Sequence, residues 1–257
     1  MELNKIHLEE VKSTNSWLLD ALASSEKRLP EGTVVYTKRQ TAGRGQVGNS
    51  WESEPGKNIS FSLLLRPEFL PIPQQFVISE LCSLGILQGL QALGVKDLSI
   101  KWPNDIYAGD DKICGILIEN RLMGGLLAES VLGVGINVNQ EKWVGNAPNP
   151  TSLLLQGVET TPETVLEIVV ERISALYAKL QNENDGASSI HKMFVAQLYR
   201  RNGYYSYADA ATGELFKAEL FDVDPQGPLM LRLSDGTERK YWFKEVQFVL
   251  PCGVVKE

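Results

Sequence analysis

The sequence predicts an α+β protein, with a larger part of mixed strands and helices over residues 1–203 and a small all-β part over residues 204–257. In the first part, short segments rich in β-branched and aromatic residues alternate with longer segments whose apolar residues recur at helical spacing. From Tyr204 onward, short strand-like segments alternate with turn sequences, a spacing that is typical of a small β-barrel. This change of pattern places a domain boundary near residue 203.

The first sixty residues predict a helix and two strands that flank a glycine-rich loop. Ser13-Thr14-Asn15 has the residue types that cap helices, and it precedes a helical run of apolar residues that begins at Trp17. Segments 33–37 and 59–65 predict strands because they are rich in β-branched and apolar residues. The glycine-rich loop 43–51 lies between these two strands.

The next segment predicts a long helix, a strand and a hairpin. Proline at the first helical turn and glycine past the last one favour a helix from Pro73 to near Gly94. Residues 98–102 predict a strand, and residues 106–119 predict a hairpin around a Gly-Asp-Asp turn.

A strand within residues 126–139 and a helix from Thr161 to about Leu180 complete the first part. The turns expected in the second part are 213–214, 224–227 and 234–236.

Composition excludes several classes of protein. The 257 residues are 43% hydrophobic and carry a formal charge of −7, which favours a globular fold and disfavours general nucleic-acid binding, because phosphate contacts need a positive surface. Cys82, Cys114 and Cys252 form no Cys-x-x-Cys pair, which argues against structural zinc and suits a reducing compartment. With no apolar signal core and no apolar run long enough to span a membrane, a cytoplasmic protein without membrane contact is expected.

The loop Gly43-Arg44-Gly45-Gln46-Val47-Gly48 matches the dinucleotide fingerprint G-x-G-x-x-G in form. That fingerprint should open a helix, whereas Pro55 and Gly56 follow here and oppose one. A plain surface loop is the simpler alternative, but it leaves Trp51 unexplained. An ordered loop that folds over a ligand accounts for the glycines, the arginine and the tryptophan together.

Three cations lie beside tight turns or glycines, where binding sites collect: Arg44, Lys101 and Lys112. Solvent-exposed side chains are the ordinary alternative for the two lysines. Cations with free backbone N–H groups suit a reaction that gathers negative charge on phosphate. A hydrolase triad has little support, because no Gly-x-Ser-x-Gly motif is present.

Together these blocks resemble the biotin protein ligase family, the biotin–[acetyl-CoA-carboxylase] ligases. The resemblance extends from about Glu10 to Leu250, and its blocks come in the family's order. Each block is a weak signal alone, but all of them in order are very specific. The blocks are Ser13-Thr14-Asn15, Gln40 through Trp51, Lys101-Trp102-Pro103-Asn104-Asp105, Lys112 with Gly115 through Glu119, Gly133-Val134-Gly135-Ile136-Asn137 and Pro150-Thr151-Ser152-Leu153.

The resemblance implies a fold and an activity. The fold is a class II tRNA-synthetase-like catalytic domain with a mixed β-sheet and helices, followed by a small SH3-like β-barrel. The activity is an ATP-dependent ligation, with Mg²⁺, that forms biotinyl-5′-AMP and transfers biotin to a lysine of a biotin carboxyl carrier domain. Some members carry an N-terminal DNA-binding domain, for which Ser13 lies too close to the start, so no nucleic-acid partner is expected. Family members often dimerise through the catalytic-domain sheet, which makes a homodimer a candidate assembly.

Residue by residue, the resemblance implies three overlapping sets, and it assigns no metal ligands. In them the glycines let backbone approach biotin, Arg44 and Lys112 hold carboxylate and phosphate oxygens, and Trp51 stacks near the adenine. The catalytic set is Arg44, Lys101, Asp105 and Lys112. The biotin-binding set is Ser13, Thr14, Asn15, Gln40, Gly43, Arg44, Gly45, Lys112, Gly115 and Gly133. The adenylate-binding set is Arg44, Gln46, Trp51, Asn104, Lys112 and Asn137.

One position departs from the family pattern. Gln46 stands where many bacterial members have a second arginine, so weaker retention of biotinyl-AMP is expected. Two other functions remain open at this point: a lipoate-protein ligase of the same superfamily, and a non-catalytic biotin-sensing regulator.

Overall fold

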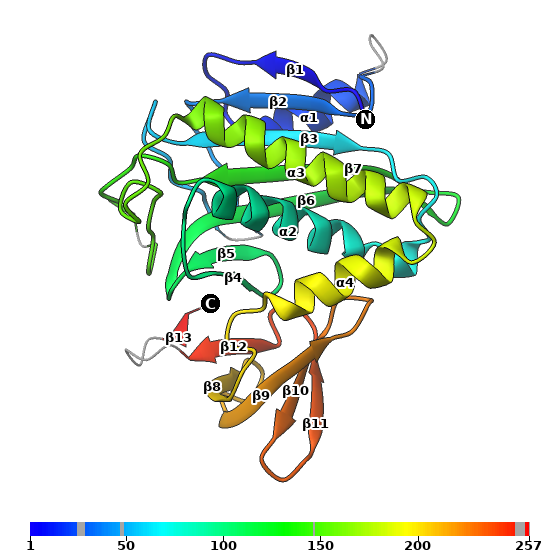
Figure 1. The fold of residues 1–257 in the computed structure, drawn as a ribbon, viewed down its shortest axis with the longest axis vertical. Coiled ribbons are helices and arrows are strands. Elements are labelled where there is room, and N and C mark those ends of the chain that lie inside the picture. Colours follow the sequence, from blue (N-terminus) through cyan, green and yellow to red (C-terminus); the bar gives the residue numbers. More distant parts are fainter. Residues whose placement is uncertain (25–28, 47–48, 146, 250–254, 257) are drawn as a thin grey trace.

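The computed structural model describes residues 1–24, 29–46, 49–145, 147–249 and 255–256, and these form two β-sheets with four α-helices (Figure 1). The first sheet has seven strands in the order β1-β2-β3-β7-β6-β5-β4. The second has six strands in the order β11-β10-β9-β8-β12-β13. The predicted α+β class is therefore confirmed.

The first sheet is mixed, because β1 runs parallel to β2 and all its other neighbours are antiparallel. All seven residues of its central strand β3 are buried, so both faces of the sheet are covered at this point. The strands are β1 Asn4–His7, β2 Thr33–Thr37, β3 Ile59–Leu65, β4 Leu98–Lys101, β5 Asp105–Ala108, β6 Asp111–Met123 and β7 Leu126–Ile136.

Two long helices cover one face of this sheet. They are α2 (Phe76–Ala92) and α3 (Pro162–Asn182), which lie side by side in front of it in Figure 1. Glycine lets them approach closely, because a Cβ at Gly85 would lie 2.6 Å from Ile173 Cγ1. The side chain of Thr161 caps the first turn of α3 by accepting from Thr164 N at 3.2 Å.

The helix α1 (Thr14–Ala23) packs on the opposite face. Ser13 caps it, with Oγ accepting from Ser16 N at 3.4 Å. Leu18 is fully buried there against Val35, Leu64 and Val131 of three neighbouring strands. On this face the helix packs mainly against β2, β3 and β7. The remaining surface is where the described residues 44–46 and 49–51 of the glycine-rich loop lie.

The second sheet begins with β8 at Tyr204, one residue after the predicted boundary. Pairings among the described residues end at β11 on one side and β13 on the other, so closure into a barrel remains a prediction. Its strands are β8 Tyr204–Asp209, β9 Leu215–Val223, β10 Leu229–Leu233, β11 Glu238–Tyr241, β12 Val246–Val249 and β13 Val255–Lys256.

The two sheets share one hydrophobic core. Tyr207 and Leu220 of the second sheet belong to the same buried cluster as Ile100 and Phe194. The helix α4 (Gly186–Ala196) lies between the two sheets along the chain and packs against α2 and α3. The small β part is therefore fixed against the larger part by apolar packing.

Sequence reasoning missed two elements, β1 and α4. β1 is a four-residue edge strand whose side chains are largely exposed, so it has no buried face to give an alternating pattern. α4 follows α3 after a short polar turn at Glu183. The sequence pattern of two helices joined in this way is hard to distinguish from that of one helix followed by a loop. No described helix combines the length and apolarity needed to cross a membrane.

Candidate functional site

A cavity of about 480 Å³ lies on the α1 side of the first sheet, where this sheet meets the second. Fourteen of the residues predicted for the site line it: Ser13, Thr14, Asn15, Gln40, Arg44, Gly45, Gln46, Trp51, Lys101, Asn104, Asp105, Lys112, Gly115 and Gly133. Segments that are far apart in the sequence therefore meet around one space.

The floor of the cavity is a ladder of facing residues on β6 and β7. Gly115 is paired with Gly135, the next row is Leu117 with Gly133, and the row after that is Glu119 with Val131. Alternate residues of a strand point to the same face, so these rows share the α1 face of the sheet. The first two rows line the cavity, and the row of Glu119 and Val131 lies beyond it. The first two rows contain three glycines and present bare backbone.

Side chains of the protein itself lie over these glycines. A Cβ on Gly115 would be 2.7 Å from Trp51 Cζ3, and one on Gly135 would collide with Trp51 Nε1. A Cβ on Gly133 would collide with the side-chain amide of Asn15. Gly115 and Gly133 were predicted to let the backbone approach biotin, which stays a prediction. In this structure Trp51 lies over Gly115 and Gly135, and Asn15 lies over Gly133.

Asn15 uses all its polar groups within the protein. Its Nδ2 donates to Leu117 O at 3.2 Å and to Glu119 Oε2 at 3.0 Å, and its Oδ1 accepts from Ser62 Oγ at 2.5 Å. An amide has two donor hydrogens and one acceptor oxygen, and both hydrogens are engaged here. Asn15 therefore joins α1 to the ladder, and it has no donor hydrogen left for a ligand.

Thr14 and Gln40 form the neighbouring wall. Thr14 N donates to Gln40 Oε1 at 3.0 Å, and Thr14 Oγ1 lies 2.8 Å from Ser62 Oγ. Ser62 has a single hydroxyl hydrogen, so a consistent arrangement has Thr14 donating to Ser62 and Ser62 donating to Asn15. This places uncharged polar groups at one end of the cavity.

Arg44 forms an ion pair with Glu119. Its Nη2 lies 2.8 Å from Glu119 Oε1, and its Nη1 donates to Glu119 Oε2 at 3.2 Å and to Ser16 Oγ at 3.2 Å. Two parallel N–H···O bonds of this kind are the bidentate geometry that arginine makes with carboxylates. The loop arginine thus binds a carboxylate of β6.

Lys112 also has a carboxylate partner. Its Nζ lies 2.7 Å from Asp105 Oδ2 and 5.7 Å from the centre of the Trp51 ring. The neighbouring Cys114 is fully buried, and this burial raises the pKa of its thiol well above the ordinary value. Cys114 is therefore not a nucleophile, which leaves the cation and the carboxylate as the reactive groups on this side.

The turn that follows β4 depends on the second sheet. Lys101 Nζ lies 5.5 Å from the Tyr107 ring centre and 5.2 Å from that of Phe248, distances at which a cation is attracted to an aromatic face. Burial raises the pKa of Tyr107, so its phenol stays neutral beside the lysine. Trp102 donates its Nε1–H to Gly227 O at 2.8 Å. Phe248 of β12 and Gly227 between β9 and β10 thus contact two consecutive residues, the last of β4 and the first after it.

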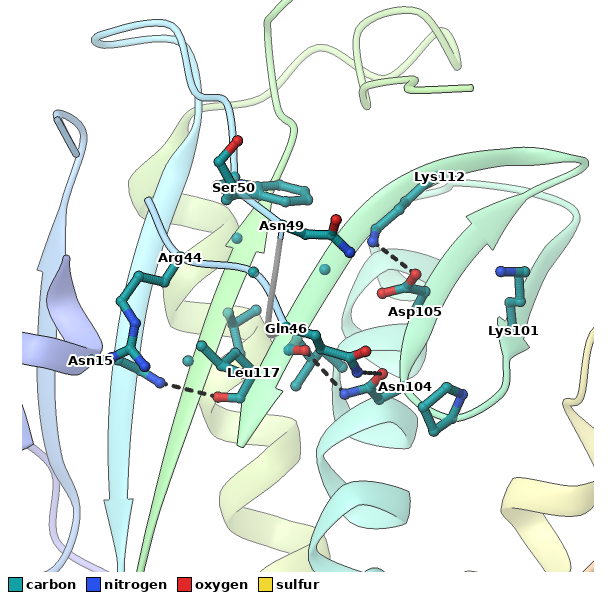
Figure 2. A pocket seen from close by; sticks show the side chains of 18 of the residues that line it. Asn15, Arg44, Gln46, Asn49, Ser50, Lys101, Asn104, Asp105, Lys112 and Leu117 are labelled. Carbon is teal, nitrogen blue, oxygen red and sulfur yellow. Dashed lines mark hydrogen bonds and ion pairs between the residues drawn. The ribbon is translucent and has the colours of Figure 1, made fainter. Parts of the chain in front are cut away.

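Gln46 connects the glycine-rich loop to the same turn. Its Nε2 donates to Asn104 Oδ1 at 3.2 Å, and Asn104 Nδ2 donates to Ile116 O at 3.0 Å. Figure 2 shows these contacts together, with Arg44 directed toward Asn15 and away from the Lys112–Asp105 pair.

Two predicted residues lie outside the cavity wall. Gly43 lies at the base of the loop, where its carbonyl accepts from Trp51 N at 3.0 Å. Asn137 is buried and donates from Nδ2 to Thr151 O at 2.9 Å. This hydrogen bond joins the end of β7 to the segment around Thr151. Val47 and Gly48 of the predicted loop lie outside the described residues.

Sequence reasoning missed several residues around the cavity. Glu119 and Gly135 were part of quoted blocks but had no role, and Ser62 had no distinguishing pattern at all. The segment 243–248 of the second sheet also lines the cavity, and its contribution depends on packing between residues far apart in the chain. Among the described residues, no group of three or more His, Cys, Asp or Glu side chains could hold a metal ion.

Comparison with known proteins places this geometry in a family. Residues 8–137 match the Biotin/lipoate A/B protein ligase family. The chain is 36% identical over 130 residues to the bifunctional ligase/repressor BirA of Bacillus spizizenii, which covers 48% of this chain and 40% of that protein. It is 35% identical over 157 residues to the biotin–[acetyl-CoA-carboxylase] ligase of Mycobacterium tuberculosis, which covers 59% of this chain and 56% of that protein.

A solved structure agrees in fold. The biotin protein ligase from Aquifex aeolicus in complex with biotin and ATP superposes with a TM-score of 0.75 at 24% identity, over 95% of this chain and 97% of that one. The aligned regions span about 40 to 56% of the length of the curated relatives named above. With half of the chain matched by the family and the fold shared with a ligase, the chain belongs to the Biotin/lipoate A/B protein ligase family.

Proposed function

We propose that this chain is an ATP-dependent biotin protein ligase. In the first half-reaction, a biotin carboxylate oxygen attacks the α-phosphate of Mg·ATP, which gives biotinyl-5′-AMP and releases pyrophosphate. In the second, the ε-amine of a lysine on a biotin carboxyl carrier domain attacks the acyl carbon, and AMP leaves. The observation that carries the proposal is that residues from five separate segments, implied by the resemblance, meet around one cavity.

The two ends of the cavity differ in charge as the two halves of this substrate do. Uncharged groups of Thr14 and Gln40 suit the neutral ureido ring of biotin, which both donates and accepts hydrogen bonds. Lys101 and Lys112 lie toward the other end, where positive charge suits carboxylate and phosphate oxygens. Chemistry of this kind depends on positioning and charge stabilisation, so no protein nucleophile is needed.

Two polar atoms near the glycine rows support the presence of a ligand. Trp51 Nε1 and Ser60 Oγ are both buried and line the cavity, yet neither has a hydrogen-bond partner among the described residues. Ser60 faces Gly135 across the β3–β7 pairing, and the Trp51 indole lies over the same glycine. Buried donors without partners are costly, so a polar ligand near Gly135 would relieve both.

The residues around Lys112 have distinct proposed tasks. Lys112 acts as a compact positive charge on the carboxylate and α-phosphate oxygens. Asp105, 2.7 Å from it, orients the incoming lysine amine in the second half-reaction. Trp51 offers a face to the adenine, and Asn104 and Gln46 lie at the reacting centre. Magnesium arrives with ATP, and because Mg²⁺ keeps phosphate and water ligands, one or two protein carboxylates suffice for it.

The test is mass spectrometry of a purified biotin carboxyl carrier domain after incubation with the enzyme, Mg·ATP and biotin. We expect the mass of one biotinyl group on one lysine, and we expect lipoate in excess to compete poorly. Preferential transfer of lipoyl would assign the chain to the lipoate branch of the family. Binding of biotin without adenylation would make the chain a biotin-sensing regulator.

A further inference from the structure

We propose that Glu119 is the resting counter-ion of Arg44, and that the carboxylate of the ligand displaces it from the guanidinium. Glu119 then sets how strongly the site prefers a carboxylate-bearing ligand over its neutral analogue. The inference rests on the proposed function, because it takes biotin as the ligand. It assigns a positioning role to a residue that sequence reasoning left without one.

The resting pair is well defined in geometry. Both Glu119 oxygens accept from Arg44, at 2.8 and 3.2 Å, and Oε2 also accepts from Asn15 Nδ2 at 3.0 Å. A carboxylate that accepts three hydrogen bonds, two of them from one guanidinium, has the geometry with which an arginine site binds a carboxylate ligand. The protein therefore supplies its own carboxylate to the arginine.

The spacing of residues along the β6–β7 ladder explains why Arg44 has to leave Glu119 to bind the ligand. Lys112 extends over Gly115, where its Cε would lie 3.3 Å from an added Cβ. Glu119 is four residues further along the same strand, which corresponds to roughly 13 Å at the usual rise of a β-strand. Arg44 on Glu119 and Lys112 on Asp105 therefore cannot hold oxygens of the same acyl-phosphate group. Figure 2 shows the two cations on opposite sides of the pocket.

The pair is also weak enough to exchange. The side chain of Arg44 is 44% exposed and that of Glu119 is 26% exposed, so water screens their attraction. Ion pairs with this exposure contribute little net stability, in contrast to fully buried ones. A ligand carboxylate that offers Arg44 the same two oxygens, together with Lys112, has the advantage of a second cation.

The exchange leaves the other anchors of the loop in place. Gln46 keeps its hydrogen bond to Asn104, and the Trp51 ring stays packed over Gly115 and Gly135. Only the side chain of Arg44 has to swing from the third row of the ladder toward the first. The loop can therefore stay over the cavity while the arginine changes partner.

The test compares two ligands on the full-length protein by isothermal titration calorimetry. The ligands are biotin and its alcohol analogue, in which a CH₂OH group replaces the carboxylate. Glu119→Gln keeps the shape of the side chain but removes its charge. Its new NH₂ group faces a donor of either Arg44 or Asn15, so one of the present hydrogen bonds is lost. We expect the variant to bind biotin about 1.5- to 5-fold more tightly, the size expected for loss of a partly exposed ion-pair competitor. We expect the affinity for the alcohol to be unchanged.

Two further variants keep the result interpretable. Glu119→Thr removes the carboxylate with a residue that suits a β-strand, and it should show the same rise in the biotin-to-alcohol affinity ratio. Glu129→Gln is the matched control, because Glu129 lies on the neighbouring strand β7 and pairs with Arg66 at 3.0 Å and Arg121 at 3.5 Å rather than with Arg44. It should leave the ratio at the wild-type value.

The outcomes separate this inference from the proposed function. If Glu119→Gln and Glu119→Thr leave the ratio unchanged or lower it, Glu119 does not compete with the ligand carboxylate and the inference is wrong. An equal loss of affinity for both ligands has the same consequence, since it assigns Glu119 a purely structural role through Asn15. If the wild-type protein binds neither ligand, the proposed function fails, independently of Glu119.

Discussion

At the scale of single residues, the notable property of the site is that its two principal cations already have carboxylate partners. Arg44 is paired with Glu119, and Lys112 is paired with Asp105. Pairing keeps long cationic side chains in defined positions before a ligand arrives, which lowers the entropic cost of binding it. It also means that each cation has to be tested together with its partner.

Lys112→Ala should nearly abolish formation of biotinyl-AMP while the protein stays folded. Loss of one electrostatic contact to the charge of a transition state typically lowers the rate by about 10²–10³-fold. The measurement is pyrophosphate release with biotin and Mg·ATP, with circular dichroism to confirm folding. Lys179→Ala is the control, because Lys179 is also an ion-paired lysine, on α3 with Glu183 at 2.6 Å. Pyrophosphate release at the wild-type rate in Lys112→Ala would rule out the role.

Gln46→Arg should slow the escape of biotinyl-AMP. The wild-type side chain makes a neutral hydrogen bond to Asn104 at 3.2 Å, whereas an arginine could make a charge-assisted one to the loop or the adenylate. The difference between the two kinds of bond is roughly 1–1.5 kcal/mol, which corresponds to about tenfold in the dissociation rate. Release of labelled intermediate in a chase measures it. An unchanged rate would mean that the Gln46–Asn104 bond already retains the loop.

At the scale of elements, the β6–β7 ladder explains why three glycines of the site are close together. Each row of the ladder receives one side chain from another element, and only a glycine leaves room for an indole or an amide to lie on the strand. The ladder thus sets the order Trp51, Asn15 and Arg44 along the α1 face of the sheet.

Gly115→Val should weaken binding of biotin by about tenfold, because the new side chain would force Trp51 and the stem of Lys112 away from the sheet. Calorimetric titration with biotin measures the change. Ile118→Val on the same strand, facing the core, is the control, and it should cost only about 0.5–1.5 kcal/mol of stability without loss of affinity. Equal affinity in Gly115→Val and wild type would remove Gly115 from the binding surface.

An element could be predicted from the sequence where it is buried or where cap and turn residues mark its ends. The prediction for β3 matched the observed residues 59–65, because this segment is rich in apolar residues, interrupted only by the small Ser60 and Ser62, and is closed by Arg66-Pro67. The expected helix start at Ser13 was confirmed as the N-cap of α1. The exposed edge strand β1 had no such signal. The expectation that the glycine-rich loop opens no helix also holds for the described residues 49–58.

At the scale of the whole molecule, the second sheet is attached partly through a histidine between two carboxylates. His191 Nδ1 lies 2.7 Å from Glu80 Oε1 of α2, and its Nε2 lies 3.6 Å from Asp222 Oδ1 of β9. The hydrogen bond to Glu80 and the two negative charges raise the pKa of His191, while burial raises the pKa of Glu80.

This contact should make stability depend on pH. His191 binds its proton more tightly in the folded chain than in the unfolded one, so the free energy of unfolding falls as the pH rises from about 6.5, the ordinary pKa of histidine, through the higher folded value. The raised pKa of Glu80 acts in the same direction at lower pH, upward from the ordinary value of a carboxyl group. Urea unfolding at about pH 6 and about pH 8.5 brackets this change. His191→Gln should reduce the difference between the two conditions, and His7→Gln, the control at the other histidine, should not. An equal pH dependence in His191→Gln and wild type would contradict this assignment.

The candidate site was predictable as a set of residues but not as an arrangement. The resemblance supplied residues between Ser13 and Asn137, and most of them line one cavity. It did not supply the partner of Arg44, because the Arg44–Glu119 contact joins residues 75 positions apart and neither residue carries a pattern that names the other. It also gave no sign that the second sheet forms part of the wall, since packing between two sheets leaves no periodicity in the sequence.

The wall segment 243–248 has a consequence for the order in which the molecule matures during synthesis. Its residues enter the chain roughly a hundred positions after Gly135, the preceding residue of the cavity wall. A ribosome adds about 5–20 residues per second, so a nascent chain holds a complete first sheet for about 5–20 seconds before this segment exists. Until Gly227 is added Trp102 lacks its hydrogen-bond acceptor, and until Phe248 is added Lys101 lacks the aromatic ring beside it. The wall of the cavity and the shared hydrophobic core are therefore completed together, when this segment joins the first sheet.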